Sequence, residues 1–122
     1  MDDILRQELE KNGADVEGTL DRFLGEEEMY VKFLKKTIDS PDFQSLSESI
    51  EQKDYKCAFR LAHALKGVTG NLGLIPIETL ASDITELLRG KELEEIDEQA
   101  VLNKKQEMQE AYHLFRNIIS ES

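Results

Sequence analysis

Residue types that are scarce in this chain of 122 residues exclude several classes of protein. The one cysteine, Cys57, cannot form a disulfide within the chain, and the first residues lack the basic and apolar regions of a signal peptide, so we expect a cytoplasmic location. Apolar runs are too interrupted for a membrane span. Basic residues are outnumbered: 15 Lys and Arg stand against 26 Asp and Glu, a formal net charge of −11. We therefore expect neither nucleic acid nor a membrane surface as a partner.

Prolines are rare as well, and no stretch alternates apolar and polar residues as a strand does. Apolar residues recur instead at helical spacing, which predicts helices over about residues 4–11, 16–24, 29–38, 43–50, 54–72, 76–88 and 101–119. Asp54 is an expected N-cap, Gly73 an expected helix end, and Pro76 suits a first turn. Pro41 either kinks one helix or separates two, because Ser40 and Pro41 also suit the start of a new helix.

The number and length of these helices indicate the fold class. Four substantial amphipathic helices joined by short polar connections favour an all-α fold, an antiparallel four-helix bundle with short N-terminal helices packed against it. The length suits one compact domain, and 39% hydrophobic residues suffice for a core. We therefore expect a single domain over residues 1–122, with the bundle core at about residues 26–119.

One helix, residues 54–72, carries residues that packing does not explain. Its apolar stripe centres near Leu65, whereas His63 and Gly67 lie about 160° away on the helical wheel, with Gly70 close beside them. A glycine inside a helix costs about 1 kcal/mol relative to alanine, so two of them suggest a purpose other than packing. Helical side chains lean toward the N-terminus, so a large residue at position 67 would cover His63. The pattern predicts an exposed imidazole that another macromolecule can approach.

The charge around His63 is the reverse of the charge of the whole chain. No Asp or Glu occurs from residue 55 through residue 77, where about five would be expected from the composition. The same window contains three cations, Lys56, Arg60 and Lys66. Lys66 stands three residues after His63 and can reach an anion attached to the imidazole. Such a local positive patch suits a small anionic target on a partner better than a long polyanion.

Other residues of this helix allow two interpretations. Phe59, one turn before His63, is either an apolar anchor for a partner or satellite core beneath the short N-terminal helices. Arg60 is a candidate partner contact. Gly70 is another, although close helix packing explains Gly70 equally well, as a helix stop explains Gly73. Cys57 is expected to be a half-buried small hydrophobe.

Two further patterns do not support a metal or nucleotide site. Glu110 and His113 have the i, i+3 spacing of a carboxylate-bridged metal site, but Arg60 stands where a second such motif would need a glutamate. We expect no metal site, and a surface position for His113. The glycines of residues 67–73 lack the spacing of a nucleotide-binding loop, so no ATP site is expected.

Residues 62–73 read Ala-His-Ala-Leu-Lys-Gly-Val-Thr-Gly-Asn-Leu-Gly and resemble the active helix of histidine-containing phosphotransfer (HPt) domains. The resemblance extends over roughly residues 13–90. In that family an exposed histidine of a four-helix bundle accepts a phosphoryl group from a receiver-domain aspartate and passes it to another. The resemblance implies His63 as the phosphoacceptor, Lys66 as the supporting cation and Gly67 as the small residue that keeps the site open.

The resemblance also implies partners and excludes others. The expected partners are receiver domains of response regulators or hybrid histidine kinases, and the expected Mg²⁺ ion belongs to the receiver, so this chain needs no cofactor. It would act as a monomeric phosphocarrier without an ATP site, not as an enzyme with turnover. Two alternatives stay open at this point: a non-catalytic helical module that binds a receiver or kinase, and the phosphoacceptor part of a split chemotaxis-type kinase. The sequence does not identify donor, acceptor or direction of flow.

Overall fold

The computed structural model describes residues 1–121, which contain helices and turns but no strand. The helices are α1 (Asp3–Lys11), α2 (Val16–Arg22), α3 (Glu27–Ile38), α4 (Asp42–Glu51), α5 (Tyr55–Asn71), α6 (Ile75–Leu88), the short 3₁₀ helix η1 (Leu93–Glu95) and α7 (Glu98–Ser120). The predicted all-helical class is confirmed. Within residues 1–121, no helix combines the length and apolar character needed to cross a membrane.

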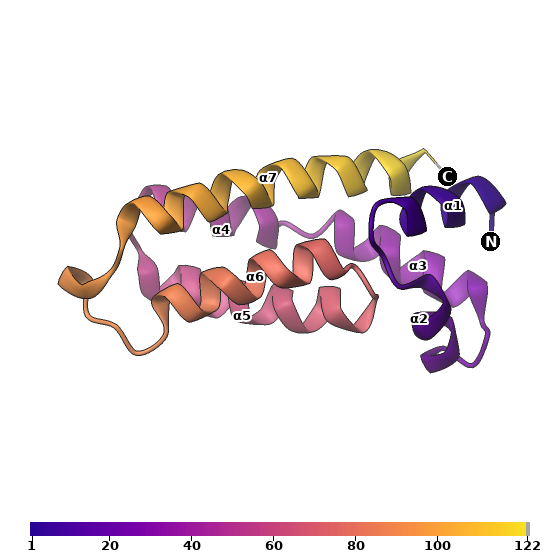
Figure 1. Ribbon diagram of the computed structural model, residues 1–122, viewed down its shortest axis with the longest axis horizontal. Helices are drawn as coiled ribbons and strands as arrows, with labels where there is room; N and C mark the ends of the chain where they lie inside the picture. Colours follow the sequence, from indigo (N-terminus) through magenta and orange to yellow (C-terminus); the bar gives the residue numbers. More distant parts are fainter. Residues whose placement is uncertain (122) are drawn as a thin grey trace.

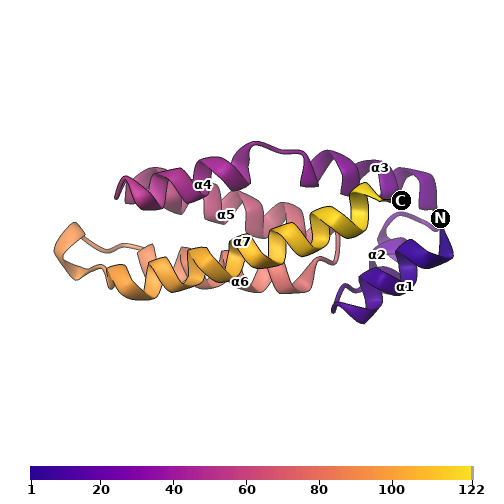
Figure 2. The ribbon, with the colours of Figure 1, turned by 90° about the horizontal axis from the view of Figure 1, so that it is seen from above.

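The long helices surround a common core. Helix α4 packs on α5, α5 on α6, α6 on α7, and α7 returns to contact α4. The chain reverses direction from each of these helices to the next (Figure 1). Helix α3 lies end to end with α4 (Figure 2) and also contacts α7. Helices α1 and α2 lie at the end of the molecule that carries both chain termini, where α1 contacts α7 and α2 contacts α3.

Helix α5 buries one face and leaves the other open. Its buried residues, spaced by three or four positions, are Ala58, Ala62, Leu65 and Thr69. They face the core between α4 and α6, because α5 packs mainly on those two helices. Val68, three residues after Leu65, continues the helical spacing of apolar residues but does not join the buried face, since it is 44% exposed. The two neighbours of α5 cover a narrower stripe than the apolar residues of the sequence span.

A similar difference occurs on the helices near the chain termini. Ile4, Met29 and Phe33 belong to the apolar residues at helical spacing in these helices, yet they are exposed. Helix α3 packs mainly on α7 and α2, which together cover Tyr30, Leu34 and Ile38 but leave the edges of its apolar stripe in solvent. The periodicity therefore located the centre of the stripe correctly and overestimated its width.

The structure settles the question about Pro41, which separates two helices. Helix α3 ends at Ile38 and α4 begins at Asp42. Pro41 is the N-cap residue of α4 and no side chain caps the helix, although the Ser40 hydroxyl oxygen accepts a hydrogen bond from the Asp42 N–H at 3.2 Å. Both helices bury residues against α7, so the break redirects the chain without separating it from the core.

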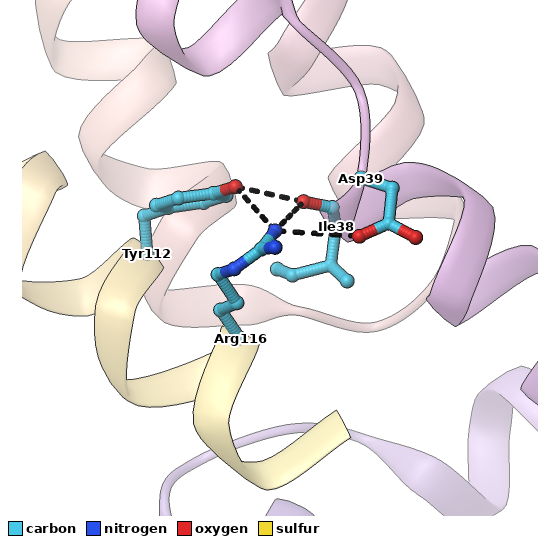
Figure 3. Close-up of polar contacts among 4 residues, drawn as sticks. All are labelled: Ile38, Asp39, Tyr112 and Arg116. Carbon is cyan, nitrogen blue, oxygen red and sulfur yellow. Dashed lines mark hydrogen bonds and ion pairs between the residues drawn. The ribbon is translucent and has the colours of Figure 1, made fainter. Parts of the chain in front are cut away.

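Helix α7 binds the end of α3 at this break (Figure 3). The Tyr112 hydroxyl donates to the Ile38 carbonyl oxygen at 2.8 Å, and Arg116 donates to the same oxygen at 3.2 Å. Arg116 also lies 3.3 Å from the Asp39 carboxylate and donates to the Tyr112 hydroxyl oxygen. The last carbonyl groups of a helix have no partner within the helix, so these contacts satisfy one of them and hold α3 against α7.

Helix α5 begins and ends where the sequence predicted. Asp54 caps it by accepting the Cys57 N–H at 3.3 Å. At its end Gly73 has φ +70°, and a Cβ at this glycine would overlap the Thr19 hydroxyl and the Asp15 carbonyl oxygen. The Asp15 N–H donates to the Gly73 carbonyl at 2.8 Å. The start of α2 is thus joined to the end of α5, and only glycine fits the junction.

Candidate functional site

The imidazole of His63 lies on the open face of α5. Its neighbour Ala62 is fully buried, and Leu65 is 2% exposed, whereas His63 itself is exposed. The imidazole forms no hydrogen bond with any of residues 1–121, and its ring stacks beside Phe59 with centroids 6.1 Å apart and planes at 15°. The predicted exposure of His63 is confirmed.

The two glycines that follow His63 have different surroundings. A Cβ added at Gly67, one turn after His63, would have nothing within 4 Å. A Cβ added at Gly70 would instead meet the Glu78 carboxylate, which reaches over from α6. The Glu78 carboxylate is the end of a flexible side chain and can move, so the space at Gly70 is adjustable, whereas Gly67 leaves open space beside the imidazole.

An open hollow of about 420 Å³ lies beside His63. It is lined by Arg22, His63, Lys66, Gly67, Gly70, Asn71 and Glu78. Lys66 is half-buried, and within the described part of the chain its ammonium forms neither an ion pair nor a hydrogen bond. An unpaired cation and an unpaired imidazole thus share one hollow, which favours an anionic group between them.

The hollow also contains two residues that the sequence did not indicate. Arg22, at the end of α2, donates from one terminal nitrogen to the carbonyl oxygens of Gly70 at 3.2 Å and Asn71 at 3.1 Å. It comes from a helix far away in sequence, so the periodicity of α5 gave no signal for it. Glu78 directly follows the acid-free window and supplies one negative charge. The acid-free window of residues 55–77 stands as counted, but α6 brings the Glu78 carboxylate next to the positive residues of α5.

Phe59 and Arg60 lie one turn before His63. The Phe59 ring is half-buried, and the Arg89 guanidinium lies over it at 5.3 Å from the centroid. Phe59 does not lie beneath the N-terminal helices, as one interpretation held, because α1 and α2 pack on α7 and α3 at the other end of the molecule. Arg60 is exposed, and its guanidinium approaches the sulfur of Cys57, which is half-buried as expected.

The second histidine lies apart from this site. His113 is exposed on α7, as predicted, and its ring lies 5.6 Å from that of Tyr112. Within residues 1–121, no three His, Cys, Asp or Glu side chains lie together in a way that could hold a metal ion.

Comparison with known families supports the sequence resemblance. The Hpt domain family matches residues 6–118 of the 122 residues. The chain belongs to the Hpt domain family. Hpt domains carry phosphoryl groups on histidine in phosphorelays and interact with receiver domains of response regulators and kinases. The match includes most of α7, which lies outside the roughly 13–90 range of the resemblance. No curated protein and no solved structure matches this Hpt domain in the same comparisons.

Proposed function

We propose that this Hpt domain accepts a phosphoryl group on His63 from the aspartate of one receiver domain and passes it to the aspartate of another. The observation that carries this proposal is the open imidazole: His63 is exposed, and a Cβ at Gly67 would meet nothing within 4 Å. A protein partner must bring its aspartyl phosphate into contact with the nucleophilic nitrogen, and a crowded histidine would prevent this.

The chemistry needs few groups from this chain. A lone pair on an imidazole nitrogen, Nε2 by family resemblance, attacks phosphorus, and the N–P bond forms while the bond from phosphorus to the aspartate oxygen breaks. The aspartate leaves as a carboxylate. The attacking nitrogen carries no proton, so no separate base is required. Lys66 is the supporting cation, since its unpaired ammonium lines the same hollow and can offset the charge of the bound phosphoryl group.

The same proposal covers the fold and the remaining site residues. Helices α4 to α7, extended by α3, are assigned as the antiparallel four-helix bundle of one domain, residues 1–122 with a core at about 26–119. Phe59, Arg60 and Gly70 stay predicted contributors to the partner-binding surface. The domain acts as a monomeric, cytoplasmic phosphocarrier, with the receiver supplying Mg²⁺.

The test compares two histidines of one chain. Wild type, His63→Gln and His113→Gln are incubated with a phosphorylated receiver domain and Mg²⁺, and acid-labile phosphate on this chain is measured after circular dichroism has shown that all three are folded. His113 is the matched control because it is exposed on α7, away from the hollow. We expect label on wild type and His113→Gln and none on His63→Gln. Equal label on His63→Gln would refute the assignment.

The donor is tested in a second arm. Label from a histidine kinase but from no receiver domain would indicate the phosphoacceptor part of a split kinase. Absence of label from both kinds of donor, with binding retained, would indicate a non-catalytic module. Either result would replace the proposed receiver-to-receiver transfer.

A further inference from the structure

One carboxylate lies in the hollow beside His63, and it belongs to Glu78 in the first turn of α6. It reaches over to α5 at Gly70, where an added Cβ would collide with it. Two cations, Lys66 and Arg22, line the same hollow. Within residues 1–121 the carboxylate nevertheless forms no ion pair and no hydrogen bond. Its negative charge is therefore not neutralised by a direct partner.

The hollow is small enough for its charges to act on one another. Its volume of about 420 Å³ corresponds to a width of about 8 Å, which is about one Debye length at physiological ionic strength. A phosphoryl group on a side chain brings a charge of about −1.5 to −2 near neutral pH. Lys66 and Arg22 attract such a group, whereas Glu78 repels it. The hollow thus combines attraction and repulsion for one anion.

The place of Glu78 in its helix has a structural explanation that does not cover its place in the hollow. A carboxylate in the first turn stabilises a helix through the macrodipole. That contribution is independent of Gly70, whereas a Cβ at Gly70 would force the carboxylate to move. The missing Cβ allows Glu78 to share the hollow with the two cations, and this position can be tested separately from helix stability.

We propose that Glu78 weakens the hold of the hollow on a phosphoryl group and so keeps that group transferable. When the group leaves His63 for a receiver aspartate, the N–P bond breaks with its electron pair on nitrogen, and an O–P bond forms at the aspartate carboxylate. Repulsion by Glu78 raises the free energy of the phosphorylated chain and shifts this equilibrium toward the receiver. The shift rests on the proposed function, whereas weaker binding of a free anion does not.

The first experiment measures the hollow without any transfer. Inorganic phosphate is titrated into the isotope-labelled full chain at low ionic strength, and the amide NMR shifts of residues 63–70 are followed. Glu78→Gln keeps the shape of the side chain and removes its charge, so we expect it to bind phosphate about threefold more tightly. Glu110→Gln, the matched control, removes the same charge from an exposed position on α7 and should change the affinity by less than about 1.5-fold.

Salt separates an electrostatic effect from a structural one. At about 1 M salt the Debye length is about 3 Å, so the difference between wild type and Glu78→Gln should largely disappear. Gly70→Ala, which displaces the carboxylate, should change the phosphate affinity of wild type but not that of Glu78→Gln, because the displaced group is then neutral. Equal effects of Glu78→Gln and Glu110→Gln, a difference that persists in salt, or the absence of phosphate shifts in residues 63–70 would overturn the proposal.

The second experiment measures the transfer equilibrium. Each variant is phosphorylated with phosphoramidate, freed of it and mixed with a receiver domain and Mg²⁺, and the final ratio of phosphorylated chain to phosphorylated receiver is measured. We expect this ratio to be about threefold higher in Glu78→Gln and unchanged in Glu110→Gln. A contact with the partner alone would alter the rate and not the ratio, so an unchanged ratio in Glu78→Gln would refute the effect on transfer. If wild type exchanges no phosphoryl group with the receiver, the proposed function fails, while the phosphate titration still decides the role of Glu78.

Discussion

Substitution of Gly67 should change two properties of the chain in opposite directions. The free energy of unfolding should rise, and the rate of the proposed phosphotransfer should fall. The residue lies inside a helix of 17 residues, is exposed, and would gain a Cβ with nothing within 4 Å. Gly67→Ala should therefore raise the free energy of unfolding by about 1 kcal/mol, the difference in helix propensity. For a chain of 122 residues this corresponds to a rise of about 4 °C in the melting temperature. Gly67→Leu should give a similar gain, because leucine has nearly the same propensity.

Phosphotransfer should fall in the same variants. A leucine side chain at position 67 points toward the N-terminus of α5 and covers the surface beside His63. We expect the rate of transfer from a phosphorylated receiver domain to fall at least on the order of tenfold in Gly67→Leu, and less in Gly67→Ala, because the partner can no longer approach to reacting distance. Phosphoramidate, a small donor, needs no docking and should label both variants at rates close to wild type.

Three results would contradict this reasoning. A folded Gly67→Leu that receives phosphoryl groups from the receiver at the wild-type rate would show that open space at position 67 is not required. A loss of stability in Gly67→Ala would show that the space is not free. Gly70→Ala is the comparison variant, since its new Cβ requires the Glu78 carboxylate to move, and a gain clearly larger than that of Gly67→Ala would contradict the difference between the two glycines.

Three further substitutions test contacts that hold the site in place. Gly73→Ala should lower the free energy of unfolding by about 3 kcal/mol in urea titrations, because φ is +70° and the Cβ overlaps the Thr19 hydroxyl. Burial raises the pKa of Tyr30 to about 12. The stability that this shift contributes is present below pH 10 and is lost toward pH 12, by up to about 1.4 kcal/mol per pH unit, and denaturation of Tyr30→Phe over this range should lack that slope. Tyr112→Phe, which removes the hydrogen bond to Ile38, should cost about 1 kcal/mol in the same titrations.

Features that depend on neighbouring residues in the chain could be predicted from the sequence. The cap at Asp54 and the helix end at Gly73 each follow from the chemistry of one residue and the turn next to it. The exposed position of His63 follows from its angle to the apolar stripe on the helical wheel, and the structure confirms that exposure. The role of Pro41 could not be predicted, because the residues next to it fit both a kink within one helix and the start of a new helix. The hydrogen bonds from α7 to the end of α3 stabilise the break at this point, and they could not be predicted from the sequence.

Features that depend on packing between distant segments could not be predicted. Arg22 and Glu78 enter the hollow from α2 and α6, and no periodicity within α5 indicates them. The acid-free window gave a correct count of charges along the chain, but distance in space decides the electrostatics of a site. The exposure of Val68 and Phe33 has the same origin, since the width of a buried stripe depends on how many helices cover it.

The buried face and the open face of α5 have different roles in a phosphocarrier: one gives stability, and the other gives access to the histidine. The buried face, with Ala62, Leu65 and Thr69 packed in the core, fixes the helix as a rigid support. Because that face supplies stability through burial, the open face can give up about 1 kcal/mol at Gly67 without unfolding the chain. A histidine on a loop would be equally exposed, but its nitrogen would be less well positioned for the proposed transfer. A half-buried helix with a glycine one turn after the histidine combines fixed position with open access, which the proposed transfer between two receiver domains requires.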